Sequence, residues 1–424
     1  MSGRRIDVAI AGGGLAGGLA ALALHRARPD LALALVEAGP MLGGTHRWSW
    51  FSSDLDPAGA ALLEPFRTHR WDGYDVRFPG FARTLSTCYN SLASSDFDAG
   101  LRRALPAETV RTGCEVAALD SRGIDLVGGE RIAARCVIDA RGLGGAPQLE
   151  GGWQVFLGRR LRTARPHGLV RPTVMDAAVD QHGSCRFVYT LPLAADELFV
   201  EDTYYDDSPA LERGALSARI DRYCAARGWE GEPLDFETGV LPVISGGDFA
   251  AFQAAQRIPG VAAIGARGGF VHPLTSYTLP FAVETALAIA ADADLAGAEL
   301  AARVEARARD HWRRTAFYRR LARMMFGAGT PEDRHRAFAL VYRLPQPLIE
   351  RFYAGRTTRA DQARILCNRP PVPVLGALRA LIPQRGRGTT RRVVEGRAAL
   401  MPQQMREPLH HASHGPPPRA GEEL

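Results

Sequence analysis

The chain has 424 residues, more than one simple hydrophobic core usually organises, so we expect two or three lobes. Hydrophobic residues make up 46% and charged residues 23%, which is ordinary for a soluble globular protein, and no apolar run reaches the roughly 18 residues that a membrane-spanning helix needs. The net charge of +6 is carried by arginine without lysine, and such a basic surface would favour an anionic membrane.

The chain begins with an apolar strand at 6–10, a glycine-rich turn, a helix and a second strand at 31–36. In the turn, Gly12 allows a tight bend, Gly14 admits a pyrophosphate to the backbone, and Gly17 lets helix and strand pack closely. The helix N-terminus offers free N–H groups to the phosphates. Glu37 follows the second strand, where a carboxylate can accept hydrogen bonds from ribose hydroxyls. The pattern predicts a dinucleotide-binding site.

Three short strands are expected next, at 108–116, 123–126 and 133–139. The last of them leads into the polar turn at Arg141, a strand-to-loop unit that many FAD proteins bring back to the cofactor. From 153 to 242 the pattern changes to short alternating strands at 185–191, 198–205 and 238–243, which is typical of an antiparallel sheet.

A buried parallel strand at 259–265 is expected to precede four helical segments, 278–296, 298–326, 331–340 and 347–353. Between strand and helix, Gly265, Gly268 and Gly269 would let the backbone approach a flat ring or a phosphate. The N-terminus of the following helix could stabilise negative charge on a reduced flavin. From 384 onward the composition predicts a disordered tail.

Two adjacent acids, Glu201 and Asp202, lie on the strand at 198–205. Because side chains alternate along a strand, Phe199, Glu201 and Thr203 share one face and Asp202 points to the other. If the first face lines an apolar cavity, desolvation raises the pKa of Glu201 and makes it a proton donor near neutral pH. The alternative is an edge-strand acid in a surface ion pair.

Aromatic residues cluster just after the ribose acid, at Trp48, Trp50 and Phe51. They could pack in a core, or they could form a cavity floor whose π faces stabilise a carbocation. In the turn before the helix at 278, His272 and Tyr277 could face a ligand, although a structural histidine is an equally good interpretation of His272.

Taken together, these segments resemble the bacterial lycopene β-cyclase family of carotenoid enzymes, in order over about residues 5–383. The glycine-rich start is shared by all FAD relatives, whereas the Glu-Asp-Thr strand at 201–203 and the turn at 265–278 are specific to the family. The matching segments are 12–17, Glu37, 46–50, 199–203, 239–242, 265–278, 342–345 and 350–355.

The resemblance implies an FAD enzyme that closes both ψ ends of lycopene into β-ionone rings, giving β-carotene by way of γ-carotene without net redox change. It also implies that the FAD must be reduced, usually by NAD(P)H. Glu201 matches the essential acid of the family and Asp202 the acid beside it. The chain departs from the family at Arg47, and it carries Ala266 where many FAD monooxygenases have an aspartate.

The fold class implied is α/β, with an FAD-binding Rossmann-like domain of the aromatic-hydroxylase type. We expect this domain at 1–152 plus 240–300, an antiparallel-sheet substrate domain at 153–239, a helical C-terminal region at 301–383, and the tail at 384–424. An FAD/NAD(P)H-dependent hydroxylase or geranylgeranyl-type reductase, and a non-catalytic carotenoid- or flavin-binding protein, remain as alternatives.

Lycopene is a long polyene dissolved in the membrane, so the protein must meet it there. The sequence shows no signal peptide, and we expect a cytoplasmic protein that is peripheral on the inner face of the cell membrane. The candidate contact segments are 370–382 and the arginine-rich helix at 313–326, which could equally pack on the core. The six cysteines lack metal-ligand spacing, so we expect reduced thiols and no metal.

Overall fold

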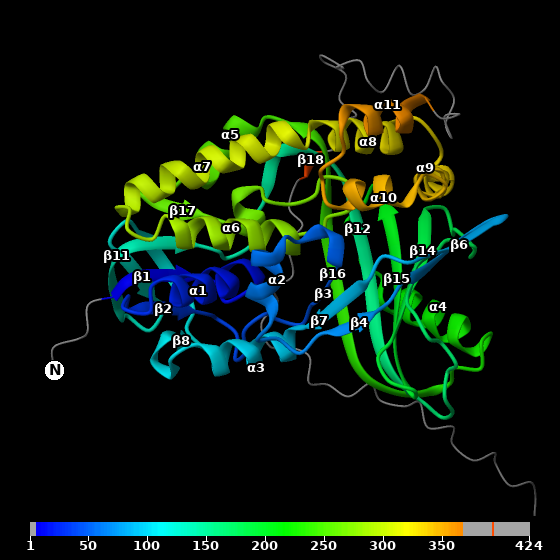
Figure 1. Ribbon diagram of the computed structural model, residues 1–424, viewed down its shortest axis with the longest axis horizontal. Helices are drawn as coiled ribbons and strands as arrows, with labels where there is room; N and C mark the ends of the chain where they lie inside the picture. Colours follow the sequence, from blue (N-terminus) through cyan, green and yellow to red (C-terminus); the bar gives the residue numbers. More distant parts are fainter. Residues whose placement is uncertain (1–5, 368–391, 394–424) are drawn as a thin grey trace, which may run out of the picture.

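The computed structural model describes residues 6–367 and 392–393, and it builds them around two large sheets that lie side by side (Figure 1). The first lobe starts with β1 (Ile6–Ala11), α1 (Leu15–Ala27) and β2 (Leu33–Val36), and β1 pairs in parallel with β2. Its seven-stranded sheet has the order β8-β2-β1-β11-β10-β9, with β17 beside β11. The remaining strands are β8 (Val110–Arg111), β9 (Val116–Asp120), β10 (Gly123–Leu126), β11 (Arg131–Asp139) and β17 (Val261–Ala263).

Two glycines make the β1–α1 turn possible. Gly12 has a φ of +102°, and a Cβ there would lie 2.6 Å from the carbonyl oxygen of Ala140. A Cβ on Gly17 would lie 1.9 Å from the carbonyl oxygen of Gly12. Any side chain at either position would therefore separate the first turn of α1 from the loop.

Helices bury the apolar faces of this first sheet. The apolar helix α6 (Leu279–Ala291) packs along α1, and α7 (Gly297–Arg314) packs on β17. The first 260 residues also contain α2 (Pro57–Leu63), α3 (Ser94–Ala104) and α5 (Phe249–Gln256), with short 3₁₀ turns at η1 (Ser52–Asp54) and η2 (Ala107–Thr109).

The second lobe is an eight-stranded sheet with the order β16-β12-β15-β14-β13-β5-β6, in which β18 also pairs with β12. Neighbouring strands are antiparallel except for β13 and β5. Its strands are β12 (Ala146–Thr163), β13 (Thr173–Asp176), β14 (Cys185–Pro192), β15 (Glu197–Asp206), β16 (Gly231–Gly247), β5 (Tyr74–Phe78), β6 (Phe81–Leu85) and β18 (Arg392–Val393).

Each face of the second sheet has its own cover. Helix α4 (Arg213–Ala225) packs on one face through Leu216, Ile220 and Tyr223. The opposite face looks toward the small sheet formed by β3 (Arg47–Phe51), β7 (Tyr89–Ala93) and β4 (His69–Trp71). The C-terminal helices gather at one end of this lobe (Figure 1). They are α8 (Ala316–Gly327), α9 (His335–Tyr342), α10 (Gln346–Tyr353) and α11 (Arg359–Cys367), with η4 (Pro331–Arg334) before α9.

The predicted fold class is confirmed, and several element boundaries differ from the predicted ones. The single helix expected at 298–326 is two helices that meet at Thr315, whose backbone (φ −89°, ψ 8°) leaves the helical region and whose hydroxyl donates to the carbonyl of His311 (2.7 Å). The strand expected at 108–116 is mostly a 3₁₀ turn and loop. The antiparallel sheet extends beyond 153–239, because β5 and β6 join it from the first hundred residues. The tail at 384–424 and the segment 370–382 lie outside the described residues, apart from β18.

Candidate active site

A cavity of about 210 Å³ lies between the second sheet, the small β3–β7–β4 sheet and the loop that leads into α6. Its walls are largely aromatic, and they also carry two carboxyl groups, Glu201 and Glu237. The aromatic lining residues are Trp48, Tyr89, Phe156, Phe187, Tyr189, Tyr205, Tyr277, Phe338 and Tyr353.

Glu201 reaches this cavity from β15. Strand pairing places it in a row that crosses four strands: Glu237 of β16 and Glu201 both oppose Gly158 of β12, and Tyr189 of β14 opposes Glu201 on the other side. The hydroxyl of Thr203 donates to Oε1 of Glu201 (2.6 Å). Directly opposed residues of antiparallel strands project from the same face of a sheet, so the row presents its side chains to the cavity.

The environment of Glu201 favours its protonated form. Burial raises the pKa of Glu201 to about 7, and the negative charge of Asp202 acts in the same direction, whereas the hydrogen bond from Thr203 opposes both. A carboxyl group with such a pKa is about half protonated at neutral pH, and its protonated form can release the proton to a substrate. Its burial, its raised pKa and its position in the cavity lining are the properties that a general acid requires.

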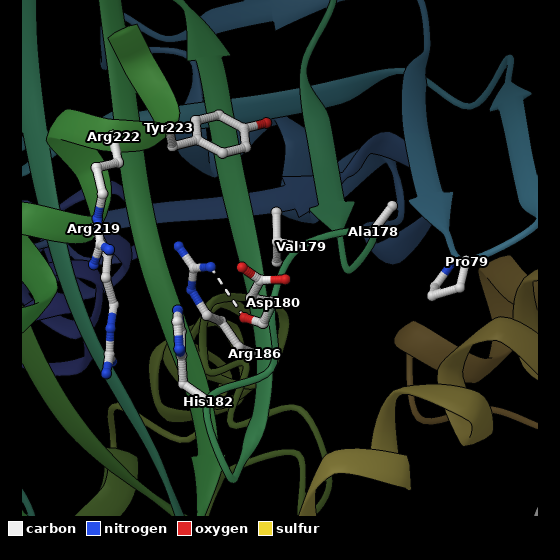
Figure 2. A pocket seen from close by; sticks show the side chains of 9 residues that line it. All are labelled: Pro79, Ala178, Val179, Asp180, His182, Arg186, Arg219, Arg222 and Tyr223. Carbon is white, nitrogen blue, oxygen red and sulfur yellow. Dashed lines mark hydrogen bonds between the residues drawn. The ribbon is translucent and has the colours of Figure 1, made fainter. Parts of the chain in front are cut away.

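Asp202 lies on the opposite face of the sheet and does not line the cavity. It is fully buried, receives a hydrogen bond from Nε of Arg186 (2.6 Å) and another from the hydroxyl of Tyr204 (3.1 Å). Figure 2 shows Arg186 on this side, in a pocket beside Asp180, His182 and Arg219. Asp202 can reach the reaction only indirectly, by anchoring β15 and through its charge.

Three tyrosine hydroxyls link the cavity wall. The hydroxyl of Tyr189 donates to that of Tyr89 (3.1 Å) and lies 2.8 Å from Oγ of Ser49, and Tyr89 in turn lies 3.3 Å from the hydroxyl of Tyr277. Burial raises the pKa of Tyr89, Tyr189 and Tyr277 well above the ordinary value, so all three rings are neutral. The network fixes the rings around the space next to Glu201.

The structure separates the aromatic residues of the predicted substrate pocket. Trp48 and Tyr277 line the cavity. Trp50 is buried in the core of the first lobe, and Phe51 packs against Tyr74, Tyr89 and Tyr353, so neither faces the cavity. Phe199 is not among the residues that line the cavity. Its ring lies over Gly158, where a Cβ would be 2.3 Å from Cζ of Phe199.

His272 is a structural residue here. It is completely buried, its Nε2 lies 3.2 Å from the carbonyl oxygen of Phe352, and its Nδ1 accepts from the backbone N–H groups of Leu274 and Thr275. Burial lowers the pKa of His272 to about 3, so the ring stays neutral. These contacts hold the loop before α6 in place and leave the imidazole no access to the cavity.

The predicted nucleotide-binding residues gather at one end of the first sheet. Both carboxylate oxygens of Glu37 accept backbone N–H bonds of 2.8 Å, Oε2 from Gly13 and Oε1 from Gly39. Gly14 begins α1 in extended backbone, with no atom within 4 Å of where a Cβ would stand. The loop thus exposes its backbone at a helix N-terminus, as a pyrophosphate site requires.

The later glycines come to the same place. Gly265 has a φ of +61°, and a Cβ there would lie 2.8 Å from Cβ of Ala16 in α1. Gly268 closes η3 (Gly265–Gly268), and Gly269, with a φ of +85°, ends it in the left-handed region. Gly265 therefore lies against the start of α1, and the three glycines make a turn that side chains would obstruct.

Arg141 is held by an ion pair that the sequence analysis did not single out. Buried Asp139 bonds to Nε of Arg141 (2.9 Å), and Arg267 approaches its other carboxylate oxygen at 2.6 Å. Asp139 thereby ties the end of β11 to η3. The position of Asp139 at a strand end was a visible signal, but its partner Arg267 is 128 residues away and only the fold brings the two together.

Glu237 is a second residue that the sequence analysis missed. Its own strand carries no motif of paired acids, and its relation to Glu201 depends on both strands pairing with β12. The cavity therefore holds one carboxyl group that the sequence predicted and one that only strand register reveals.

Comparison with known structures first defines the class of protein. A geranylgeranyl bacteriochlorophyll reductase-like protein from Thermoplasma acidophilum superposes with a TM-score of 0.59 at 13% identity, over 89% of this chain and all of that one. HpxO of Klebsiella pneumoniae, solved with FAD and uric acid, also gives 0.59, at 17% identity over 87% of this chain and 98% of that one. The chain therefore has the fold of FAD-dependent monooxygenases and reductases.

Sequence comparison defines the family within this class. The lycopene cyclase protein family matches residues 7–379. The lycopene β-cyclases of Pseudescherichia vulneris and of a Paracoccus species are 43% and 41% identical to this chain, each over 89% of it and 97% of the relative. The lycopene β-cyclase of Pantoea ananas is 39% identical over 89% of this chain and 98% of its own length. The chain belongs to the lycopene cyclase family.

The ion pair behind Glu201 leads to a stability prediction. Asp202→Asn should lower the free energy of unfolding by about 3 kcal/mol, because it leaves the buried guanidinium of Arg186 without its charged partner. Denaturant unfolding followed by circular dichroism measures this. Glu201→Gln is the matched control on the neighbouring residue and should change stability by less than about 1 kcal/mol. Equal losses in the two variants would contradict the assignment of Asp202 to a structural ion pair.

Proposed function

We propose that this protein is a lycopene β-cyclase, which converts both ψ ends of lycopene into β rings, by way of γ-carotene to β-carotene. The observation that carries the proposal is the position of Glu201, a carboxyl group whose pKa is raised by burial in an aromatic cavity. The named activity of three family relatives supports the same reaction. No feature of the site favours a hydroxylase or a reductase over it.

The residues of the cavity account for the chemical steps. Glu201 gives its proton to C2 of the terminal alkene, which leaves a cation at the tertiary carbon C1. The C5=C6 bond then attacks C1 and closes a six-membered ring, and loss of the C6 proton leaves the β ring. The lining tyrosines and Trp48 present π faces to the developing positive charge, each worth about 1–2 kcal/mol in a desolvated site. Thr203 holds the carboxyl group of Glu201 in place.

We extend the proposal to FAD, bound by the first lobe. The loop of Gly12, Gly14 and Gly17 would hold the pyrophosphate, Glu37 would accept from ribose hydroxyls, and Arg141 with the turn of Gly265, Gly268 and Gly269 would lie along the cofactor. Bound in its reduced form, with NAD(P)H as the cellular reductant, FAD would supply negative charge that stabilises a carbocation. The α6 N-terminus, whose residues Thr278 and Leu279 line the cavity, would favour such an anion.

The first prediction of the proposal concerns the acid. Glu201→Gln should reduce conversion of lycopene at least about 100-fold, because the amide cannot donate the proton to the alkene. The assay uses protein loaded with FAD and reduced by dithionite without oxygen, and carotenoids are extracted and separated. FAD binding by the variant should be unchanged.

Glu197→Gln is the control on the same strand, at the outer end where Glu197 bonds to Arg162. It should keep activity within about threefold. Substantial cyclisation by Glu201→Gln would remove the acid assignment, and stoichiometric consumption of NAD(P)H by the wild-type protein would indicate a reductase or an oxygenase.

The second prediction concerns pH. Because the protonated form of Glu201 is the active one, kcat/KM should fall about tenfold per pH unit above the pKa of about 7. Asp202→Asn should move this midpoint to lower pH, since the charge of Asp202 contributes to the raised pKa of Glu201. The profile is measured on the reduced holoenzyme, and a rate that rises with pH through neutrality would contradict the role of Glu201.

The cavity is small for a long polyene, so we infer that one end group enters at a time while the rest of the molecule stays outside. No helix in the described part of the chain, 6–367, is long and apolar enough to cross a membrane. Of the two predicted contact segments, α8 turns Phe317 and Met325 into the core, and 370–382 lies outside the described residues. We propose peripheral contact with the inner face of the cell membrane.

That contact is tested by flotation with liposomes of anionic phospholipid. The protein should float with them and should float less at high salt, because a basic surface binds anionic headgroups through screened charge. A protein that remains in the dense fraction at low salt would contradict peripheral binding. Neutral phosphatidylcholine liposomes serve as the control.

A further inference from the structure

The cavity contains a carboxyl group for which the steps above have no role. Glu237 lies on β16, and it faces Gly158 across one strand boundary while Glu201 faces the same glycine across the other. Strands in a sheet lie about 4.8 Å apart, so the two Cα atoms are separated by roughly 10 Å. Both side chains project from the cavity face, one on either side of a residue that has no side chain.

Aromatic rings lie between and beside the two acids, and the guanidinium of Arg47 lies 5.5 Å from the centre of the Phe199 ring. The ring of Phe199 covers Gly158, and the ring of Phe156 covers Gly239, where a Cβ would lie 2.3 Å from Cζ of Phe156. Glycine at both positions lets aromatic rings form a floor, with the Phe199 ring between the carboxyl groups and the Phe156 ring beside Glu237 in the next row. A hydrocarbon end group lying on this floor would have one carboxyl group at each side.

Glu237 has a neighbouring cation, Arg47, whereas the hydrogen-bond partner of Glu201 is a neutral hydroxyl. The backbone N–H of Arg47 donates to Oε1 of Glu237 (2.9 Å), and the Arg47 guanidinium, which lies over the ring of Phe199, also favours a negative charge there. Burial and the proximity of Glu201 raise the pKa of Glu237 well above its ordinary value. Two carboxyl groups that share one desolvated cavity repel each other when both are ionised, so the pair retains one proton.

We propose that Glu237 is the base of the cyclisation, the group that removes the proton from C6. This inference rests on the proposed function and adds a second catalytic residue to it. The amide and the charge of Arg47 lower the pKa of Glu237 against the larger effect of burial, and Glu201 has no cationic partner among its hydrogen bonds. The acid and the base are therefore on opposite sides of the same end group.

The two carboxyl groups, Glu201 and Glu237, account for every proton that the reaction adds or removes. The proton of Glu201 forms the new C2–H bond with the electrons of the C1=C2 double bond. The electrons of C5=C6 form the C1–C6 bond, and the electrons of the C6–H bond then form the new C5=C6 double bond as the proton passes to Glu237. C2 and C6 are both bonded to C1, so one placement of the end group serves both transfers. The pair holds one proton before and after, and transfer from Glu237 to Glu201 resets it.

The test separates proton donation from proton removal by running the reaction in D₂O. Wild-type holoenzyme and Glu237→Gln, each with reduced FAD, are given lycopene, and both the products and the recovered lycopene are analysed by mass spectrometry. In Glu237→Gln, formation of β rings should fall at least about 100-fold. Glu201 still protonates C2 there, and reversal of that step should leave deuterium in the recovered lycopene. Glu201→Gln should show neither rings nor deuterium.

Glu232→Gln is the matched control, an exposed acid on the same strand, and should match the wild type. Glu237→Asp provides a second test if the amide variant folds poorly: its shorter side chain should slow ring formation and also lead to deuterium in recovered lycopene. The proposal is overturned if Glu237→Gln forms β rings within about threefold of the wild type, or if, with FAD bound, it loses deuterium incorporation together with cyclisation. Failure of the wild-type protein to convert lycopene would instead overturn the proposed function.

Discussion

Desolvation of one carboxyl group is the constraint on which the site depends. In water Glu201 would be ionised at neutral pH, and an ionised carboxylate cannot protonate an alkene. The aromatic walls around it, from β3, β14, β15 and the loop before α6, remove that water and raise the pKa of Glu201 to about 7, so that a large fraction stays protonated at neutral pH. The same walls present π faces to a cationic intermediate, although the guanidinium of Arg47 is also part of the lining. One environment thus serves both the donor and the species that it creates.

The neighbouring acids Glu201 and Asp202 lie on opposite faces of β15 and have different environments. Glu201 is exposed to a cavity with a single neutral hydrogen-bond donor, whereas Asp202 is paired with a guanidinium and buried behind the sheet. A buried ion pair contributes little net stability but is costly to break, so Asp202 and Arg186 restrain the strand that carries the acid. The negative charge of Asp202 also raises the pKa of Glu201, so a residue on one face of the sheet affects the acid on the other face.

The cavity lies where the two lobes meet, and this placement connects the site to the rest of the family fold. Asp139 joins β11 to η3 through Arg141 and Arg267, and buried His272 holds the loop that runs from η3 to α6. The short segment from η3 to α6 therefore has the glycine turn of the first lobe at one end and the cavity beside the second sheet at the other. A cofactor on the first lobe and a substrate against the second sheet would therefore share a boundary.

Local pattern was enough to predict much of this protein. The strand–glycine–helix start, Glu37 and the opposite orientations of Glu201 and Asp202 follow from neighbouring residues, because turn geometry and strand alternation are set within a few positions. The same local rules could not decide whether Trp50, Phe51 and His272 face a ligand, since burial depends on what packs against them. The pairing of Glu201 with Glu237 across Gly158 arose only in the tertiary structure, because strand register joins segments that are distant in the chain and carry no shared sequence signal.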